Sequence, residues 1–420
     1  ELGEDISPSS REFDYGNAQT QIEQINVHEM HNQGYTGEGV RILLIDTGFD
    51  LSHNAFQGID VIDQWDVIND DLETANENED EQNINQDSHG TKILSLIAAN
   101  MPGELLGTAF NAEFLLAKTE DVSQEIQQEE DNLVAGLEWG ESNGADIVSI
   151  SLGYLDWYEY EDMDGNTAIT TIAIDIATSL GVLCVTGAGN EANNDWYYIA
   201  APADADSVIS VGAVNSDGEI ANFSSRGPTF DGRIKPEVCA MGSSVWHVSS
   251  NNTTDYVRAS GTSSSTPLVA GALALIWQAR PDLSPMQLRE AVLMTASLAE
   301  SPNNTYGYGI LNAVEALNYW SNSSIGGFQA YPDNYNILRA YPNPFNPAIN
   351  IEINSFEESI TDVSIISFSG QFVKNIFTGK ILNSTQIILW EPENLSSGIY
   401  FVRLINDKNQ YKYRKITYLK

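Results

Sequence analysis

The sequence predicts an α/β fold of three layers with a mostly parallel central sheet, followed by a small all-β sandwich. Between residues 35 and 318, apolar β-branched runs alternate with longer helical runs, which is typical of a parallel sheet covered by helices on both faces. A stretch rich in Ser, Asn and Gly then interrupts this alternation. Beyond it, short strands recur between turns, as they do in a sandwich.

The elements of the first region are predicted from their composition and their end signals. Four runs of β-branched residues are typical of buried strands, and they lie at 40–45, 145–149, 181–185 and 208–214. Helices are expected at 90–99, 131–142 and 168–180, and as a pair after Gly261. The second helix of that pair starts after Ser284, because Pro285 and Gln287 complete a capping box there.

The second region is predicted to form five strands, at 349–353, 362–368, 386–390, 399–404 and 411–417. The chain is therefore expected to have four parts. These are an N-terminal extension over 1–15, an α/β domain over 16–320, a linker over 321–335 and a β-sandwich domain over 336–420.

Charge is distributed unevenly along the 420 residues. The formal net charge is −40, yet residues 333–420 hold 9 Lys and Arg against 8 Asp and Glu, so the first 332 residues carry a net charge of −41. Such a field repels nucleic acid and anionic membranes and favours cations. No apolar run reaches the roughly 20 residues that a transmembrane helix needs. We therefore expect neither a nucleic-acid partner nor a membrane span.

The N-terminus is relevant to the targeting of the protein, and the two cysteines are relevant to the redox state of its compartment. The chain begins with Glu1 and shows no signal peptide, so we expect a processed chain from which the signal peptide and any propeptide are missing. Cys184 and Cys239 lie in apolar, strand-like contexts, which favours two buried thiols. A disulfide between them stays open, because spacing alone does not place one.

Three side chains are candidates for hydrolytic catalysis. Ser263 stands before a predicted helix, where unpaired backbone N–H groups can stabilise a developing oxyanion. His89 opens another helix beside a small glycine, and it is the best candidate base among five histidines. Asp46 follows the strand at 40–45, at the strand end where open α/β sheets place functional groups. Each alone is more often structural, as a helix cap, a packed histidine or a turn residue.

Four short motifs resemble the subtilisin family of serine proteases. They are Ile-Asp-Thr-Gly at 45–48, His-Gly-Thr at 89–91, Gly-Ala-Gly-Asn at 187–190 and Gly-Thr-Ser at 261–263. Their order, with Asp before His before Ser, is that of this family. The resemblance covers residues 16–318. It implies a subtilisin-like three-layer fold and a secreted serine endopeptidase with protein and peptide substrates.

The resemblance also implies a role for each site residue. Ser263 is the nucleophile, His89 is the general base, and Asp46 orients the imidazole. The side-chain amide of Asn190 and the Ser263 backbone N–H hold the oxyanion. Substrate backbone pairs with a first segment, formed by Ser151, Leu152 and Gly153. The first specificity pocket lies beside a second segment, formed by Gly187, Ala188 and Gly189.

The sequence departs from the family's pattern around the nucleophile. Lys92 stands where the family usually has His, and Met241 stands where Pro is usual. Residues 264–268, Ser-Ser-Thr-Pro-Leu, replace the commoner Met-Ala-Thr-Pro-His. None of these departures removes a catalytic group, so they bear on fine specificity.

Calcium is the metal that the acidic loop before His89 favours. Asp66, Asp70, Asp71 and Glu73 supply hard oxygen ligands, and relatives carry calcium in a similar stretch. A merely solvated loop is the open alternative, because residues 70–87 are acidic and Asn-rich almost throughout.

The C-terminal region resembles the sorting domain of the type IX secretion system. The resemblance rests on the Pro-rich segment at 341–347, on Ser-Gly-Ile-Tyr-Phe-Val-Arg-Leu at 397–404 and on the basic end at 412–420. It implies export across a Gram-negative outer membrane, to the medium or the cell surface, with the secretion machinery as a partner. A generic sandwich that binds carbohydrate or packs on the protease is the alternative.

We expect an active endopeptidase that acts as a monomer. The rival is a catalytically inactive subtilase scaffold used for surface binding or adhesion. Such scaffolds commonly lose a triad member or the oxyanion Asn, and here all four residues remain. An esterase with a Gly-x-Ser-x-Gly motif is excluded, because Ser265 stands where the second glycine is required.

Overall fold

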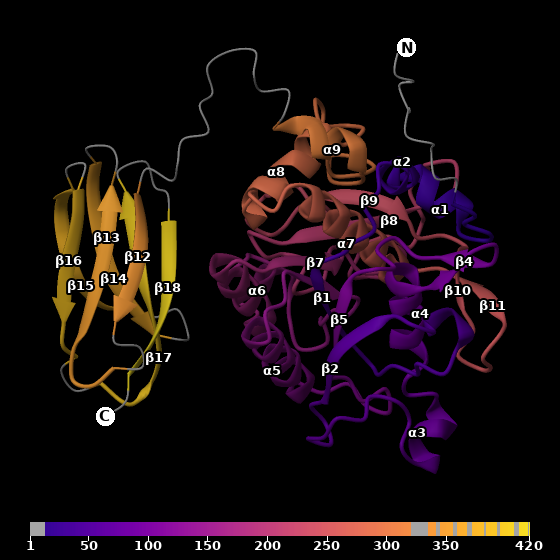
Figure 1. The fold of residues 1–420 in the computed structure, drawn as a ribbon, viewed down its shortest axis with the longest axis horizontal. Helices are drawn as coiled ribbons and strands as arrows, with labels where there is room; N and C mark the ends of the chain where they lie inside the picture. The colour runs from indigo at the N-terminus through magenta and orange to yellow at the C-terminus, as the bar shows by residue number, and fades with distance from the viewer. Residues whose placement is uncertain are drawn as a thin grey trace, which may run out of the picture. The chain divides into compact units, whose positions relative to one another are not determined.

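A seven-stranded sheet forms the centre of the first of two compact units, Glu1–Asn322 and Ser323–Lys420 (Figure 1). The computed structural model describes residues 13–320, 335–341, 345–355, 359–367, 372–381, 384–392, 395–406, 411–418 and 420. Most of the predicted N-terminal extension and of the linker, residues 1–12 and 321–334, lies outside these residues.

The strands of this sheet follow the order β2-β5-β1-β6-β7-β8-β9, and every neighbouring pair is parallel. Their bounds are β1 Arg41–Asp46, β2 Asp60–Asp66, β5 Glu113–Lys118, β6 Ile147–Ile150, β7 Leu183–Gly187, β8 Ile209–Val214 and β9 Val238–Met241. The predicted parallel sheet is thereby confirmed. Because these strands point the same way, the carboxyl ends of β1, β6 and β7 meet at one edge.

Alternate side chains of β1 belong to two separate cores. Ile42 and Leu44 point into one core and Leu43 and Ile45 into the other, and all four are fully buried. Helices cover both faces of the sheet, as predicted (Figure 1). The first core contains side chains of α4 Ser88–Ala98, α7 Thr262–Ala279, α8 Pro285–Thr295 and α9 Ala313–Tyr319; the second contains side chains of α5 Gln128–Ser142 and α6 Ile169–Leu180.

Short elements complete this unit. They are α1 Gln19–Gln24, α2 Val27–Asn32, η1 Asn54–Phe56, α3 Glu79–Ile84, β3 Asn100–Met101, β4 Leu105–Leu106, η2 Tyr160–Asp162 and the hairpin of β10 Val245–Val248 with β11 Tyr256–Ala259. Among the helices of the described residues, none combines the length and the apolar character needed to cross a membrane.

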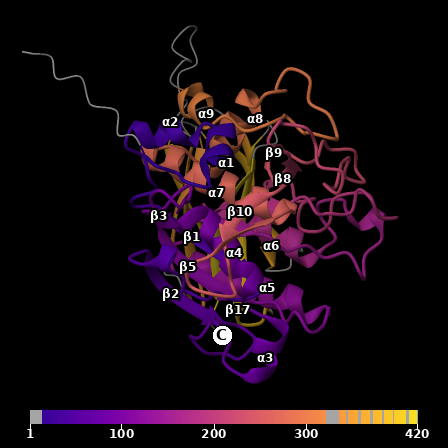
Figure 2. The same ribbon diagram turned by 90° about the vertical axis from the view of Figure 1, so that its right-hand side faces the viewer.

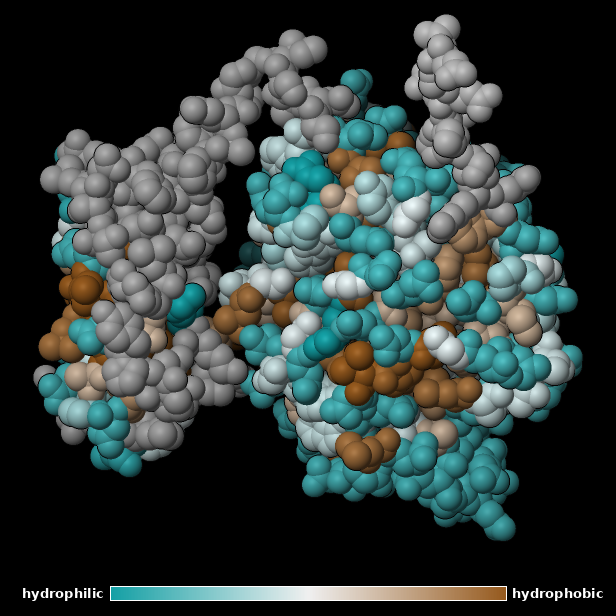
Figure 3. Space-filling model, in the orientation of Figure 1, coloured by the Kyte–Doolittle hydropathy of each residue, from teal (hydrophilic) through white to brown (hydrophobic). Residues whose placement is uncertain are grey.

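The structure adds elements that the sequence did not predict. Strands β2, β5 and β9 are short or carry charged residues, so none of them contains a long β-branched run. The acidic stretch at 70–87, expected as a loop, contains α3. The Asn78 side chain accepts a hydrogen bond from the Glu81 N–H and so caps this helix, and acidic residues in its first turn favour it. On the face that Figure 3 shows, the surface over α3 is mainly hydrophilic.

The second unit consists of two antiparallel sheets, ordered β12-β13-β16 and β15-β14-β17-β18, as expected for a sandwich. The strands are β12 Tyr335–Tyr341, β13 Ile349–Ser355, β14 Ser359–Ser367, β15 Phe372–Ile381, β16 Ser384–Trp390, β17 Gly398–Asn406 and β18 Tyr411–Tyr418. All five predicted strands are present, and β12 and β15 are additional. Alternate residues of β13 and β17, such as Ile351 and Val402, form the core between the sheets.

Candidate active site

Asp46 ends β1 at the edge of the sheet where the strand termini meet. Its carboxylate is almost completely buried, and Oδ1 accepts a hydrogen bond of 2.7 Å from the Thr47 backbone N–H. Oδ1 also lies 2.7 Å from His89 Nδ1. The carboxylate therefore fixes both the orientation of the imidazole and the ring nitrogen that carries its proton.

His89 is the second residue of α4 and brings its imidazole to Asp46 through a close helix–strand contact. Gly90 makes this approach possible, because a Cβ there would lie 2.2 Å from the Gly48 carbonyl oxygen. The imidazole is 39% exposed, whereas Asp46 is 1% exposed. One side of the ring thus faces solvent while the other is held by a buried anion.

The electrostatic environment of His89 favours its charged form. Burial lowers the pKa of His89, but the negative charge of Asp46 and its hydrogen bond raise it more, so the pKa lies above its ordinary value of 6.5. The positive charge of Lys92 opposes this shift.

Ser263 is the second residue of α7, and its position depends on a proline one turn later. Pro267 has no N–H, so the Ser263 carbonyl receives no helical hydrogen bond from that residue. The Ser151 hydroxyl donates to this carbonyl instead, at 3.1 Å. Ser263 Oγ in turn donates to the Ser151 carbonyl at 3.4 Å. In the part of the chain that the structure describes, the Ser263 hydroxyl makes no hydrogen bond to His89.

Asn190 follows β7, and its side chain is hydrogen-bonded to the first residue of α7. Its Oδ1 accepts hydrogen bonds from the Thr262 backbone N–H at 2.9 Å and from Thr262 Oγ1 at 3.3 Å. Because Oδ1 is held in this way, the exposed Nδ2 amide remains able to donate. Gly189 precedes it with φ +105°, and a Cβ at that position would lie 2.8 Å from Ser225 Oγ. Thr262 belongs to the Gly-Thr-Ser motif, although the motif alone did not predict this supporting role.

The two predicted substrate-binding segments follow adjacent parallel strands. Ser151, Leu152 and Gly153 come directly after β6, and Gly187 ends β7 before Ala188 and Gly189. Ala200 lies between them: a Cβ on Gly153 would lie 3.4 Å from the Ala200 Cβ, and the Ala200 N–H donates to the Ala188 carbonyl at 3.3 Å.

The acidic loop gathers a different set of carboxylates from the four predicted. Asp66, Asp71 and Glu77 each place one oxygen within 4.8 Å of the others, and this is the group in the described residues that could hold a cation. Asp70 and Glu73 do not belong to it; their side chains are exposed. Glu77 was missed because it is one of many acidic residues in a featureless run.

A buried ammonium group already lies in this cluster. Lys118 Nζ is 2.7 Å from Asp66 Oδ2 and 3.3 Å from Glu81 Oε1. Asp66 Oδ1 also accepts the backbone N–H groups of Ile68 and Asn69. Asp66 is therefore largely satisfied, while Asp71 and Glu77 retain oxygens that can face an ion. The donor set fits calcium only in part, because an ion has to share Asp66 with Lys118.

The two thiols are separate from the site and from each other. Cys184 and Cys239 are buried and unpaired, which confirms the predicted buried thiols. Burial raises the pKa of each to about 12, so neither is a thiolate nucleophile.

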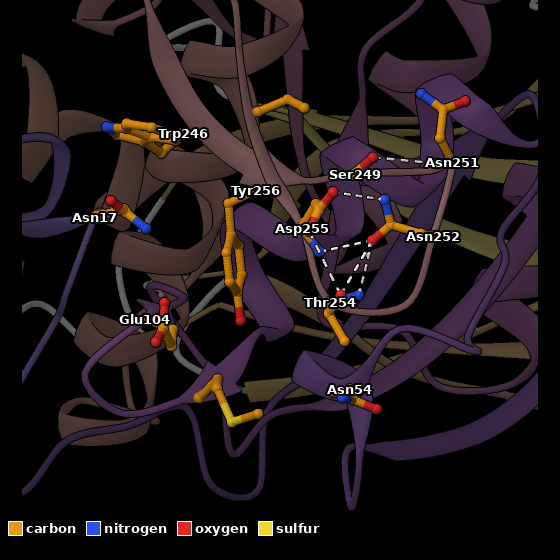
Figure 4. A pocket seen from close by; sticks show the side chains of 12 residues that line it. Asn17, Asn54, Glu104, Trp246, Ser249, Asn251, Asn252, Thr254, Asp255 and Tyr256 are labelled. Atoms are coloured by element: carbon orange, nitrogen blue, oxygen red, sulfur yellow. Dashed lines mark hydrogen bonds between the residues drawn. The ribbon is translucent and has the colours of Figure 1, made fainter.

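A cavity of about 670 Å³ lies beside the β10–β11 hairpin (Figure 4). Trp246 and Tyr256 line it together with Asn17 and Glu104, and its lining includes none of the predicted catalytic residues. It is therefore distinct from the candidate active site.

Comparison with known proteins identifies the class to which this site belongs. Residues 37–309 match the subtilase family, and residues 339–418 match the secretion system C-terminal sorting domain. The chain belongs to the subtilase family. It is a serine protease with a sorting domain at its C-terminal end, and the predicted secretion follows from that domain.

Individual relatives agree with this assignment. The chain is 34% identical over 302 residues to subtilisin E of Bacillus subtilis (strain 168), covering 70% of each protein. It is 34% identical to the subtilisin of Bacillus pumilus, covering 70% of this chain and 97% of the relative.

Solved structures of two proteases share the fold. The prenylagaramide maturation protease PagA has a TM-score of 0.55 at 22% identity, over 70% of this chain and 97% of that one. The self-cleaved protease domain of PatA has a TM-score of 0.54 at 24% identity, over 68% of this chain and 98% of that one.

The Asp46–His89 contact predicts a measurable titration. In Asp46→Asn, the pKa of His89 falls below 6.5, because burial and Lys92 still act and the anion is gone. Histidine-selective NMR titration of the imidazole measures this change. The matched control is Asp60→Asn, an exposed carboxylate on β2, which leaves the His89 titration where it is. An unchanged pKa in Asp46→Asn would contradict the assigned contact.

Proposed function

We propose that this secreted protease is an endopeptidase that cleaves peptide bonds through an acyl-enzyme on Ser263. The observation that carries the proposal is the 2.7 Å hydrogen bond between His89 Nδ1 and the buried Asp46 carboxylate. That bond leaves Nε2 as the available base on a half-exposed ring. The backbone contact of Ser263 with Ser151 and that of Asn190 with Thr262 bring the other two groups to the same edge of the sheet.

Acylation begins when His89 Nε2 takes the Ser263 hydroxyl proton as Oγ attacks the scissile carbonyl carbon. Asp46 stays ionised and stabilises the imidazolium. His89 then returns the proton to the leaving amine, and the carbon–nitrogen bond breaks. A water molecule enters, gives its proton to His89 and attacks the acyl carbon, and the proton finally returns to Ser263 as the carboxylic product leaves.

The oxyanion of each tetrahedral intermediate lies between two donors. Asn190 Nδ2 is one, and the backbone N–H of Ser263 in the first turn of α7 is the other. The Thr262 N–H supports this assignment, because it holds Asn190 Oδ1 and turns the amide so that nitrogen is the free end. Donors that are already oriented need no rearrangement as charge develops.

Substrate binding reorganises the Ser263 hydroxyl. In the free enzyme it donates weakly to the Ser151 carbonyl at 3.4 Å. Catalytic hydrogen bonds are often long in free enzymes and shorten when substrate binds. Substrate backbone pairs with residues 151–153, and its side chain enters the space beside residues 187–189.

The C-terminal domain delivers the enzyme. We assign the peptidase domain to 16–320, a linker to 321–335 and the sorting domain to 336–420. The type IX secretion machinery of a Gram-negative bacterium is its partner, and the protease acts as a monomer in the medium or at the cell surface.

The proposal predicts that Ser263 carries all hydrolysis. Purified wild type cleaves a mixed peptide library internally, and Ser263→Ala loses roughly 10³- to 10⁶-fold of the rate, because no nucleophile remains. A serine-directed fluorophosphonate labels wild type and not the variant. Equal cleavage by both forms would contradict the proposal. A wild type that neither cleaves nor takes the label would favour the inactive binding scaffold.

The oxyanion assignment predicts a loss confined to turnover. Asn190→Ala lowers kcat by about 10²- to 10³-fold with little change in KM, the size measured for one such donor in the related subtilisin. Asn194→Ala, an exposed asparagine on the same loop, is the control and keeps full activity. Steady-state kinetics on a peptide anilide separate the two parameters. A loss in KM alone would assign Asn190 to ground-state binding.

We further propose that calcium binds at Asp71 and Glu77, beside Asp66 and Lys118. Burial and the charges of Asp71 and Glu81 raise the pKa of Glu77, as expected where carboxylates crowd together. A cation relieves this repulsion and stabilises the loop that precedes His89.

Thermal unfolding tests the calcium site, in the Ser263→Ala background to prevent self-digestion. Calcium at 10 mM raises Tm by roughly 2–6 °C over the chelated protein, the gain expected for a weak extracellular-type site. Asp71→Asn removes the gain and Glu73→Gln keeps it, because Glu73 lies outside the cluster. An equal gain in both variants would place the calcium elsewhere.

A further inference from the structure

A buried histidine lies directly behind the candidate nucleophile. His247, on β10, is 1% exposed, and its Nε2 is 3.0 Å from the hydroxyl oxygen of Ser264. Ser264 follows Ser263 in the first turn of α7 and is itself buried. It is also the first of the residues at which this chain departs from the family's usual sequence after the nucleophile.

The same strand is bonded to the helix of the candidate base. The Val248 backbone N–H donates to Ser95 Oγ on α4 at 3.2 Å. Two residues further on, Ser250 Oγ lies 2.7 Å from Ser88 Oγ, beside His89. Strand β10 therefore bonds once to α4 and once to α7, and Ser250, two residues after the strand ends, adds a second bond to α4. Figure 2 shows β10 beside α4.

The His247 imidazole acts as a neutral hydrogen-bonding group. Burial lowers the pKa of His247 to about 3, and the positive charges of His89 and Lys92 lower it as well. The ring therefore stays uncharged at every pH at which His89 is a functional base. Its contribution is the fixed hydrogen bond to Ser264 rather than a charge.

We propose that His247 is a positioning residue: by holding Ser264, it fixes the first turn of α7 so that Ser263 stands within reach of His89. The proposal rests on the serine-protease mechanism above. The bonds from Val248 to Ser95 and from Ser250 to Ser88 fix the helix of the base. The bond from His247 to Ser264 fixes the first turn of the nucleophile's helix. One strand thus sets the distance between the two groups, and a reacting pair is sensitive to small displacements.

Substitutions at both ends of the bond test this proposal. His247→Leu and Ser264→Ala each remove the hydrogen bond, whereas His247→Gln places a polar group where Nε2 was. We expect kcat to fall roughly 3- to 10-fold in the first two variants, the effect of losing one ordinary hydrogen bond, with KM unchanged. The double variant falls no further, and His247→Gln regains most of the rate.

Two controls separate positioning from general stability and from charge. His31→Leu removes another buried histidine, bonded to Tyr15 and to the Thr108 carbonyl; it lowers thermal stability and leaves kcat unchanged. The acid limb of the kcat/KM profile keeps its midpoint in His247→Leu, because a neutral ring exerts no charge on His89.

The outcomes are distinct. Additive losses in the double variant, a change in KM alone, or equal rates in His247→Leu and His247→Gln would overturn the positioning role. A shifted acid limb would assign His247 an electrostatic role instead. A wild type that fails to cleave peptides would overturn the proposed function and this inference with it, whereas an active wild type with any of the outcomes above would overturn this inference alone.

Discussion

Parallel pairing within a sheet whose central strands are buried is the constraint on which the site depends. Adjacent parallel strands end at the same edge, so β1, β6 and β7 bring Asp46, Ser151 and Gly187 together although about 140 residues separate the first from the last. The ladders fix the register of β1, with Leu44 opposite Leu116 on one side and Ser149 on the other, and its side chains divide between the two cores. The edge that carries the candidate active site is thus a consequence of strand pairing.

Helix ends supply the remaining groups. The N-termini of α4 and α7 approach this edge and carry His89 and Ser263, where unpaired N–H groups favour a developing anion. Close contacts require special residues at both points. Gly90 lets α4 approach Gly48, and Pro267 frees a carbonyl for Ser151. Gly90 and Pro267 act through the local backbone, and their effect on the site becomes apparent only in the folded protein.

The strong negative charge of the first unit contrasts with the cations in its interior. Lys235, nearly fully buried, lies 2.9 Å from Glu237, which also pairs with Arg289 at 2.7 Å. Lys118 is similarly paired with Asp66. Buried charges of this kind are tolerated only with such partners, and removing one partner typically costs about 3–5 kcal/mol. Other buried carboxylates, such as Glu130 and Asp204, accept hydrogen bonds from neutral donors instead.

The sequence by itself determined the fold class and the sandwich at the C-terminal end, and it selected Asp46, His89, Asn190 and Ser263 as candidate site residues, because short motifs and apolar periodicity are local properties. Of the four predicted calcium ligands, Asp66 and Asp71 group with Glu77 and not with Asp70 or Glu73. In an acidic run, the sequence does not distinguish a ligand carboxylate from its neighbours, because only the folded loop brings particular oxygens together. The supporting contacts were likewise not predictable from the sequence: Thr262 with Asn190, Lys118 with Asp66 and His247 with Ser264. Their partners are close in space and, for Lys118 and Asp66, 52 residues apart in the chain, so tertiary packing alone decided those contacts.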